Sequence, residues 1–123
     1  MTIAERIEKD IVSCPCGRLH HTSLKIVEIS AGAREKLPEV LEKLQYGRVF
    51  WIADENTWPI LGEKAVALMR QAGIQESGVV LPGDVHADEL GVGRVMMHND
   101  RTADELLAIG SGTINDIAKF LSS

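Results

Sequence analysis

The 123 residues include 18 acidic and 13 basic side chains, which give a net charge of −5, and 45% of the chain is apolar. This length is enough for one globular domain with a core. The negative charge argues against general nucleic-acid binding, because phosphate backbones favour clustered Lys and Arg. No apolar run reaches the length of a membrane span, and Met1–Asp10 contains no signal-peptide core. We therefore expect a cytoplasmic protein that binds neither nucleic acid nor membranes.

Residues 1–23 are expected to form a short helix and a turn rich in Cys and His. Isoleucines recur every four residues among charged side chains, which predicts an amphipathic helix over Thr2–Ser13. Four potential zinc ligands follow within eight residues: Cys14, Cys16, His20 and His21. One interpretation is a small structural zinc site. The other is a turn with reduced thiols, because Cys-x-Cys is tighter than the usual spacing of zinc ligands.

Strand-like and helix-like patterns alternate through the remainder of the chain. The expected strands are Leu24–Ile29, Arg48–Ala53, Val79–Leu81 and Leu106–Ile109. The expected helices are Ala33–Leu44, a segment between Asp54 and Gly73, Ala87–Met97 and Ile114–Leu121. This order predicts an α/β fold with a mostly parallel sheet and helices on both faces, similar to a Rossmann domain.

Small residues connect the last strand to the last helix. Gly110-Ser111-Gly112-Thr113 is a turn with little side-chain bulk, and such a turn at a helix N-terminus can bind phosphate through backbone N–H groups. Asp54 follows an earlier strand and is expected at the same carboxyl edge of the sheet, where ligands of such folds bind. Each feature also has a structural interpretation. The turn could bind nothing, Asp54 could cap a helix, and Asp116 could offset the helix dipole.

Three segments together resemble a known family: IADENTW (52–58), DVHADEL (84–90) and LLAIGSGTINDIAKF (106–120). They are similar to the N-terminal half of glycerol-1-phosphate dehydrogenases, in the iron-containing alcohol dehydrogenase and dehydroquinate synthase-like superfamily. The CPCGRLHH segment also looks like members of this group. The resemblance extends over about residues 12–121.

The resemblance implies a dinucleotide-binding domain over residues 1–123, with NAD or NADP as the cofactor. It assigns Asp54 to the adenosine end of the cofactor. It assigns the pyrophosphate to a loop that consists of Gly110, Ser111, Gly112, Thr113, Ile114, Asn115 and Asp116. The implied reaction is the reduction of dihydroxyacetone phosphate, a small phosphorylated substrate, to sn-glycerol 1-phosphate.

Enzymes of this family are much longer, and their second half is a helical domain that binds a divalent metal (zinc, iron or nickel) through an Asp and two His. We therefore expect this chain to be a truncated part of such an enzyme, or a natural fragment, with no catalytic residues of its own. Self-association into a homo-oligomer is expected through surfaces that the second half would cover. The alternatives are a glycerol or other alcohol dehydrogenase of the superfamily, or a non-catalytic nucleotide-binding or interaction domain.

Overall fold

A computed structural model describes the chain except for residues 1, 4, 6, 8–13, 21–22 and 46. The chain divides into two compact units, Met1–Ala33 and Arg34–Ser123. The helix expected over Thr2–Ser13 lies largely outside the described residues and stays a prediction, and His21 lies outside them as well. Among the helices of the described residues, none is both long and apolar enough to cross a bilayer.

The strand expected at Leu24–Ile29 is wrong. Residues 23–29 have no strand conformation, and the side chains of Leu24 and Ile29 are 60% and 71% exposed. A strand is defined by hydrogen bonds to a neighbour, and an alternating apolar pattern does not by itself supply that neighbour. In the described part of the chain, the sheet contains three other strands and not this segment.

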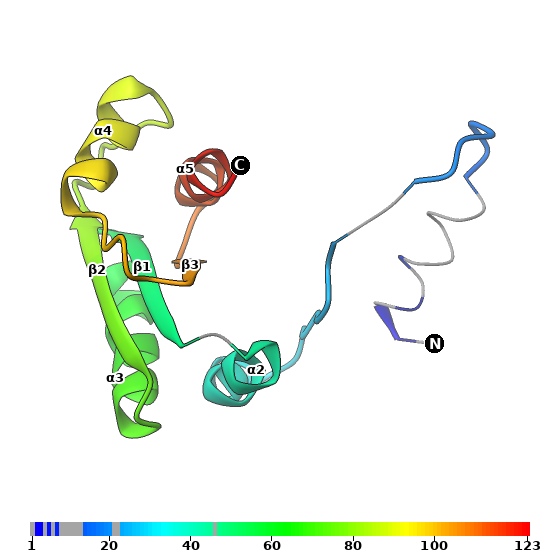
Figure 1. Ribbon diagram of the computed structural model, residues 1–123, viewed down its shortest axis with the longest axis horizontal. Coiled ribbons are helices and arrows are strands. Elements are labelled where there is room, and N and C mark those ends of the chain that lie inside the picture. Colours follow the sequence, from blue (N-terminus) through cyan, green and yellow to red (C-terminus); the bar gives the residue numbers. More distant parts are fainter. Residues whose placement is uncertain (1, 4, 6, 8–13, 21–22, 46) are drawn as a thin grey trace. The chain divides into compact units, whose positions relative to one another are not determined.

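The second unit is built on a parallel sheet of β1 (Arg48–Asp54), β2 (Gln75–Leu81) and β3 (Glu105–Ala108). The strand order is β2-β1-β3, and Figure 1 shows β1 between its neighbours. All residues of β1 after the first are buried, as expected for a central strand covered on both faces. The chain leaves β1 toward β2 and later returns past β1 to form β3. The direction of winding therefore reverses beside β1, as at the ligand site of doubly wound folds.

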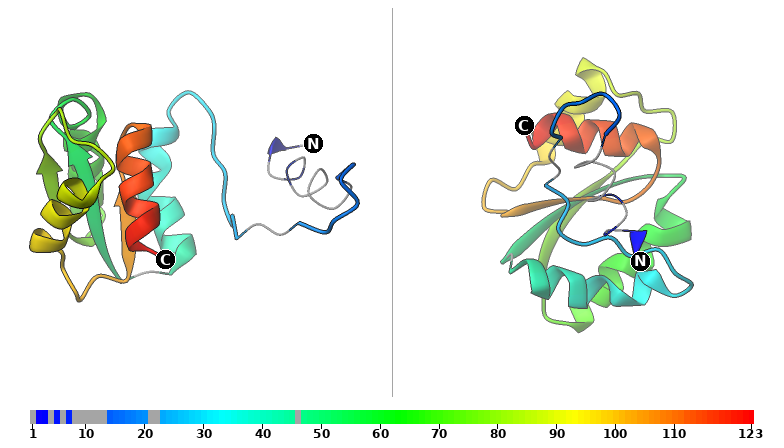
Figure 2. Two further views of the ribbon diagram at one scale, coloured as in Figure 1. Left: turned by 90° about the horizontal axis from the view of Figure 1, so that it is seen from above. Right: turned by 90° about the vertical axis from the view of Figure 1, so that its right-hand side faces the viewer.

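Helices cover both faces of this sheet, which confirms the predicted α/β fold (Figure 2). The helical segments are a 3-10 turn (Ala33–Lys36), α2 (Leu37–Leu44), a π-helical turn (Trp58–Gly62), α3 (Glu63–Gln71), α4 (Glu89–His98) and α5 (Gly112–Leu121). Trp51 and its face of β1 pack with residues of α2 and α3. Phe50 and Ile52 pack on the other face with residues of α4 and α5. Side chains therefore alternate between two apolar layers along β1.

Several elements begin at positions that differ from the predicted ones, among them β2, α4 and α5, which begins at Gly112 and not at Ile114. β2 begins at Gln75, four residues before Val79, because its polar first half pairs with β1 at the edge of the sheet. α4 begins at Glu89, after Asp88, whose carboxylate accepts a hydrogen bond of 2.9 Å from the Gly91 amide. This N-cap sets the start of a helix that contains two glycines.

Candidate functional site

The two parts of the predicted site lie at the same edge of the sheet and contact each other. Asp54 is the last residue of β1, and the glycine turn follows β3, which lies parallel and adjacent to β1. The Thr57 hydroxyl donates a hydrogen bond of 2.9 Å to the Ile109 carbonyl oxygen. It also accepts one of 3.1 Å from the Asp54 amide. One side chain thus joins the carboxyl ends of both strands.

Asp54 closes the turn that follows β1. Its side chain is 4% exposed, and Oδ1 accepts hydrogen bonds of 2.8 Å from the amides of both Asn56 and Thr57. Asp54 therefore caps the turn and not a helix, because the residue at the N-cap position of the following π-helical segment is Thr57. Both of these hydrogen bonds go to Oδ1. The cofactor role of Asp54 stays a prediction.

Glu55 and Asn56 connect the same turn to the loop after β2. The Glu55 carboxylate accepts a hydrogen bond of 3.0 Å from the Gly83 amide, and the Asn56 side-chain amide donates one of 3.0 Å to the Gly83 carbonyl. The four residues Asp54–Thr57 therefore hold three loops together at the carboxyl edge. Our sequence reasoning missed these roles, although four polar residues directly after a buried strand were a usable signal.

Gly110 is required by the close approach of the two loops. Its φ is +144°, a conformation that side chains rarely allow, and a Cβ there would lie 2.5 Å from Thr57 Cγ2. Gly112 is different, because a Cβ at that position would meet no atom within 4 Å. Gly110, Ser111 and Gly112 are all exposed. The turn therefore packs against Thr57 at Gly110 and has open space around Gly112.

The N-terminus of α5 has the donors that an anion site needs. Ser111 is the N-cap residue, and its side chain makes no capping hydrogen bond. The first amides of a helix lack intrahelical partners and lie at the positive end of the helix dipole. The side chain of Ile114 is buried in the core, whereas Asn115 and Asp116 are exposed. An open turn with uncapped amides can bind an anionic group, and the pyrophosphate role of residues 110–116 stays a prediction.

Cys14, Cys16 and His20 are brought together in the first unit. Their metal-binding atoms all lie within 4.8 Å of one another, and Cys16 Sγ is 3.0 Å from His20 Nε2. The pKa of the Cys16 thiol is lowered, first by a hydrogen bond from the Arg18 backbone and then by the Cys14 side chain. Three of the four candidate zinc ligands therefore meet, and His21 is outside the described residues.

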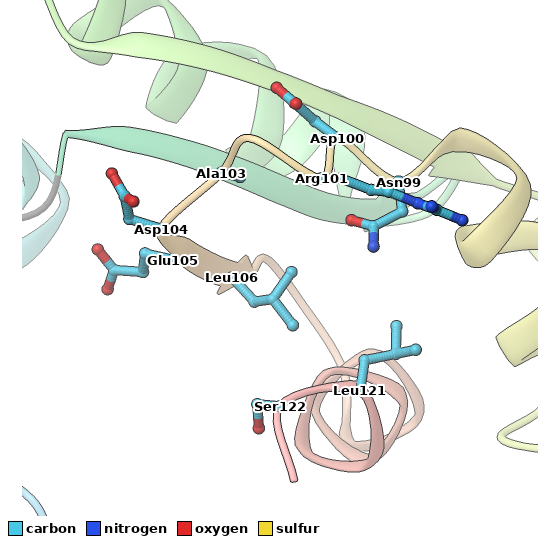
Figure 3. Close-up of a pocket in the computed structure, with 9 residues that line it drawn as sticks. All are labelled: Asn99, Asp100, Arg101, Ala103, Asp104, Glu105, Leu106, Leu121 and Ser122. Carbon is cyan, nitrogen blue, oxygen red and sulfur yellow. The ribbon is translucent and has the colours of Figure 1, made fainter.

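A separate pocket lies at the amino end of β3 (Figure 3). Asp104 accepts hydrogen bonds of 3.1 Å from the amides of Gly47 and Arg48 there. Burial raises the pKa of Glu105, and its Oε2 is buried without a hydrogen-bond partner among the described residues. The acidic residues make this end of the sheet unfavourable for an anionic ligand, in contrast to the carboxyl edge.

Comparison with known proteins identifies relatives of most of the chain. A family profile described as iron-containing alcohol dehydrogenase matches residues 28–123. A Bacillus licheniformis protein named glycerol-1-phosphate dehydrogenase (NAD(P)+) is 31% identical over 93% of this chain, but over 30% of its own length. A Bacillus subtilis protein of the same name is 32% identical over 79% of this chain and 26% of its own length.

A solved structure supports the fold. The crystal structure of glycerol dehydrogenase from Schizosaccharomyces pombe aligns with 72% of this chain and 23% of its own length, at a TM-score of 0.57 and 17% identity. The chain thus spans less than a third of the relatives that it matches.

Proposed function

Because the chain belongs to the iron-containing alcohol dehydrogenase family, we propose that Arg34–Ser123 is the dinucleotide-binding unit of an NAD(P)-dependent oxidoreductase. The observation that carries this proposal is the contact between the turn after β1 and the glycine turn after β3. Ligands of parallel α/β sheets bind outside the carboxyl ends of the strands, where the winding direction reverses. Both turns lie at that point of this sheet.

The roles of the residues follow from the groups that they present. The amides of Gly112 and Thr113, at the start of α5, hold the pyrophosphate through hydrogen bonds and the helix dipole. Asp54 uses Oδ2 to accept a hydrogen bond from a ribose hydroxyl at the adenosine end, while Oδ1 keeps the turn closed. The cofactor, when bound, supplies the hydride that the oxidoreductase transfers.

The finer proposal is that the whole protein is a glycerol-1-phosphate dehydrogenase that reduces dihydroxyacetone phosphate. The names of the relatives support it, at about 30% identity. The divalent metal and the substrate pocket would belong to the part of the relatives that this chain does not match. We therefore expect this chain alone to bind cofactor weakly, with a dissociation constant of about 1 mM or somewhat below, and not to turn over substrate.

Calorimetric titration of the chain with NADH and NADPH tests the binding. Gly112→Asp places a negative charge beside the pyrophosphate, in space where a side chain meets no atom, and an acid in the first turn is favourable for a helix. This variant should stay folded and lose the heat of binding. The matched control is Gly93→Asp, which adds the same charge at another helical glycine with open space and should bind like the wild type.

An absence of heat with the folded wild type at millimolar NADH or NADPH would contradict cofactor binding, and so would equal affinity of Gly112→Asp and wild type. The substrate proposal has a separate test. The full product of the gene should oxidise NADH or NADPH when given dihydroxyacetone phosphate, and a chelator should abolish this activity. Activity with glycerol but not with glycerol 1-phosphate would favour the alternative alcohol substrate.

A further inference from the structure

The turn at Cys14–His20 presents three metal-binding groups on one short stretch of chain. Cys14 is half-buried, and Cys16 and His20 are exposed, so an ion from solvent can reach the cluster. Thiolate and imidazole are the ligands of structural zinc sites. No feature of the proposed cofactor site involves these residues, since they belong to the unit Met1–Ala33.

The distances are close to those that a tetrahedral ion requires. With Zn–S bonds of about 2.3 Å and Zn–N bonds of about 2.0 Å, neighbouring ligand atoms are about 3.5–3.8 Å apart. The three donor atoms lie within 4.8 Å of one another, and the Cys16–His20 pair is 3.0 Å apart. Side-chain rotations alone can adjust these separations, because two of the three residues are exposed.

The backbone explains how a gap of one residue can place both cysteines at one ion. The Gly17 amide donates a hydrogen bond of 3.1 Å to the Cys14 carbonyl, which closes a tight turn. Pro15 restricts the backbone at the second position of this turn, and Gly17 supplies the positive φ of +75° at its end. His20 then approaches Cys16 from four residues further along. The turn is therefore largely formed before an ion binds.

We propose that Cys14, Cys16 and His20 bind one zinc ion per chain and that this ion is a structural clip for the N-terminal unit. Two thiolates neutralise the charge of Zn²⁺, and the imidazole of His20 is the third ligand. The fourth tetrahedral position is taken by water or by another donor.

Cobalt is the probe, because Co²⁺ occupies zinc sites and absorbs visible light. The reduced, metal-free chain is titrated with Co²⁺, and zinc is then added. The expected result is the charge-transfer absorption of thiolate–cobalt bonds, visible bands of tetrahedral cobalt, saturation at one ion per chain, and loss of the absorption when zinc displaces cobalt.

Single substitutions identify the ligands. Cys14→Ser, Cys16→Ser and His20→Asn should each weaken zinc binding at least 10- to 100-fold, the loss that even an outer-shell partner of a metal ligand causes. His98→Asn is the matched control, since His98 lies on α4 and contacts the Arg94 carbonyl, and it should leave the affinity unchanged. Circular dichroism should show that all variants keep the α/β fold.

Three results would overturn the proposal. The first is a reduced wild-type chain without charge-transfer absorption, and the second is a spectrum that is unchanged in Cys16→Ser and His20→Asn. The third is saturation at one ion per two chains, which would place the ion between copies instead of within one turn.

Discussion

At the scale of single residues, Thr57 connects the two parts of the candidate site. Its hydroxyl bonds to the backbone at the ends of β1 and β3, and its methyl group lies 2.5 Å from the position that a Cβ of Gly110 would take. The sequence alone predicts the positions of Asp54 and the glycine turn, because strand ends and small residues are visible in it. It does not predict the contact through Thr57, which depends on the strand order.

Thr57→Val should lower the free energy of unfolding by about 1–3 kcal/mol, because it leaves the Asp54 amide and the Ile109 carbonyl without this partner. Urea denaturation measures the change. Thr57→Ser keeps the hydroxyl and should retain most of the stability. Equal losses in the two variants would show that the methyl group, and not the hydrogen bonds, holds the loops together.

Two substitutions of Asp54 separate its structural role in the turn from its proposed role in cofactor binding. Asp54→Ala should destabilise the fold by about 0.5–2 kcal/mol, the usual loss for a capping residue. Asp54→Asn keeps an oxygen for the amides of Asn56 and Thr57 and should be nearly as stable as the wild type. Its side-chain NH2 cannot accept from a ribose hydroxyl, so NADH affinity should fall about 10-fold, or about 1.4 kcal/mol. Unchanged affinity in a stable Asp54→Asn would leave Asp54 with the structural role alone.

At the scale of elements, β1 and β2 are joined by Trp51. Its ring stacks on Trp58 with centroids 4.9 Å apart, and its Nε1 donates a hydrogen bond of 2.5 Å to the Glu76 carboxylate. Burial raises the pKa of Glu76, but hydrogen bonds from Trp51 and Arg70 outweigh it and leave the pKa below its usual value. Gly78 is opposite Trp51 in the register of β1 and β2.

Gly78→Ala should destabilise the unit by about 1–3 kcal/mol, because the new Cβ would lie 2.1 Å from the Trp51 ring and must displace it. Near-ultraviolet circular dichroism should report the loss of the Trp51–Trp58 stack. The control is Gly93→Ala, in open space on α4, which should raise stability by about 0.5–1 kcal/mol. A stable Gly78→Ala with an unchanged aromatic spectrum would contradict this packing.

Elements with a strong apolar pattern in the sequence were predicted, and elements without such a pattern were missed in part. The apolar runs of β1 and the amphipathic spacing of α5 predicted both elements, because a buried strand and a one-sided helix leave strong patterns. The first half of β2 was missed, because residues 75–78 contain no large apolar side chain. Leu24–Ile29 has the alternating pattern of a strand, but the structure assigns it to no strand.

At the scale of the whole molecule, the unit Arg34–Ser123 has opposite electrostatic character at the two ends of its sheet. At the amino end, Asp104 accepts a hydrogen bond from the Arg48 amide, and Asp100 accepts one from the Arg48 side chain. At the carboxyl end, the first amides of α5 have no side-chain cap. Asp100 accepts hydrogen bonds from Thr102 and Ser77 and pairs with Arg48 at 3.2 Å. The hydrogen bonds from Thr102 and Ser77, with the charge of Arg48, lower the pKa of Asp100 to about 2.

A lowered pKa has a defined consequence for acid stability. The folded state holds the proton of Asp100 less tightly than the unfolded state, so the stabilisation is complete above pH 3.8 and is lost as the pH falls toward about 2. Asp100→Asn should therefore unfold at a lower urea concentration than the wild type at pH 6, and the difference should shrink at pH 2. A difference that stays constant with pH would exclude this ionisation as the cause.

Amide chemical shifts, recorded while NADH is added to the isotopically labelled chain, test the proposed cofactor site most directly. We predict that the perturbed amides cluster at residues 54–57 and 110–115, and that Gly112→Asp abolishes the changes. Perturbations confined to the amino end of the sheet, around Asp100 and Glu105, would contradict the proposal, as would an absence of change at millimolar NADH.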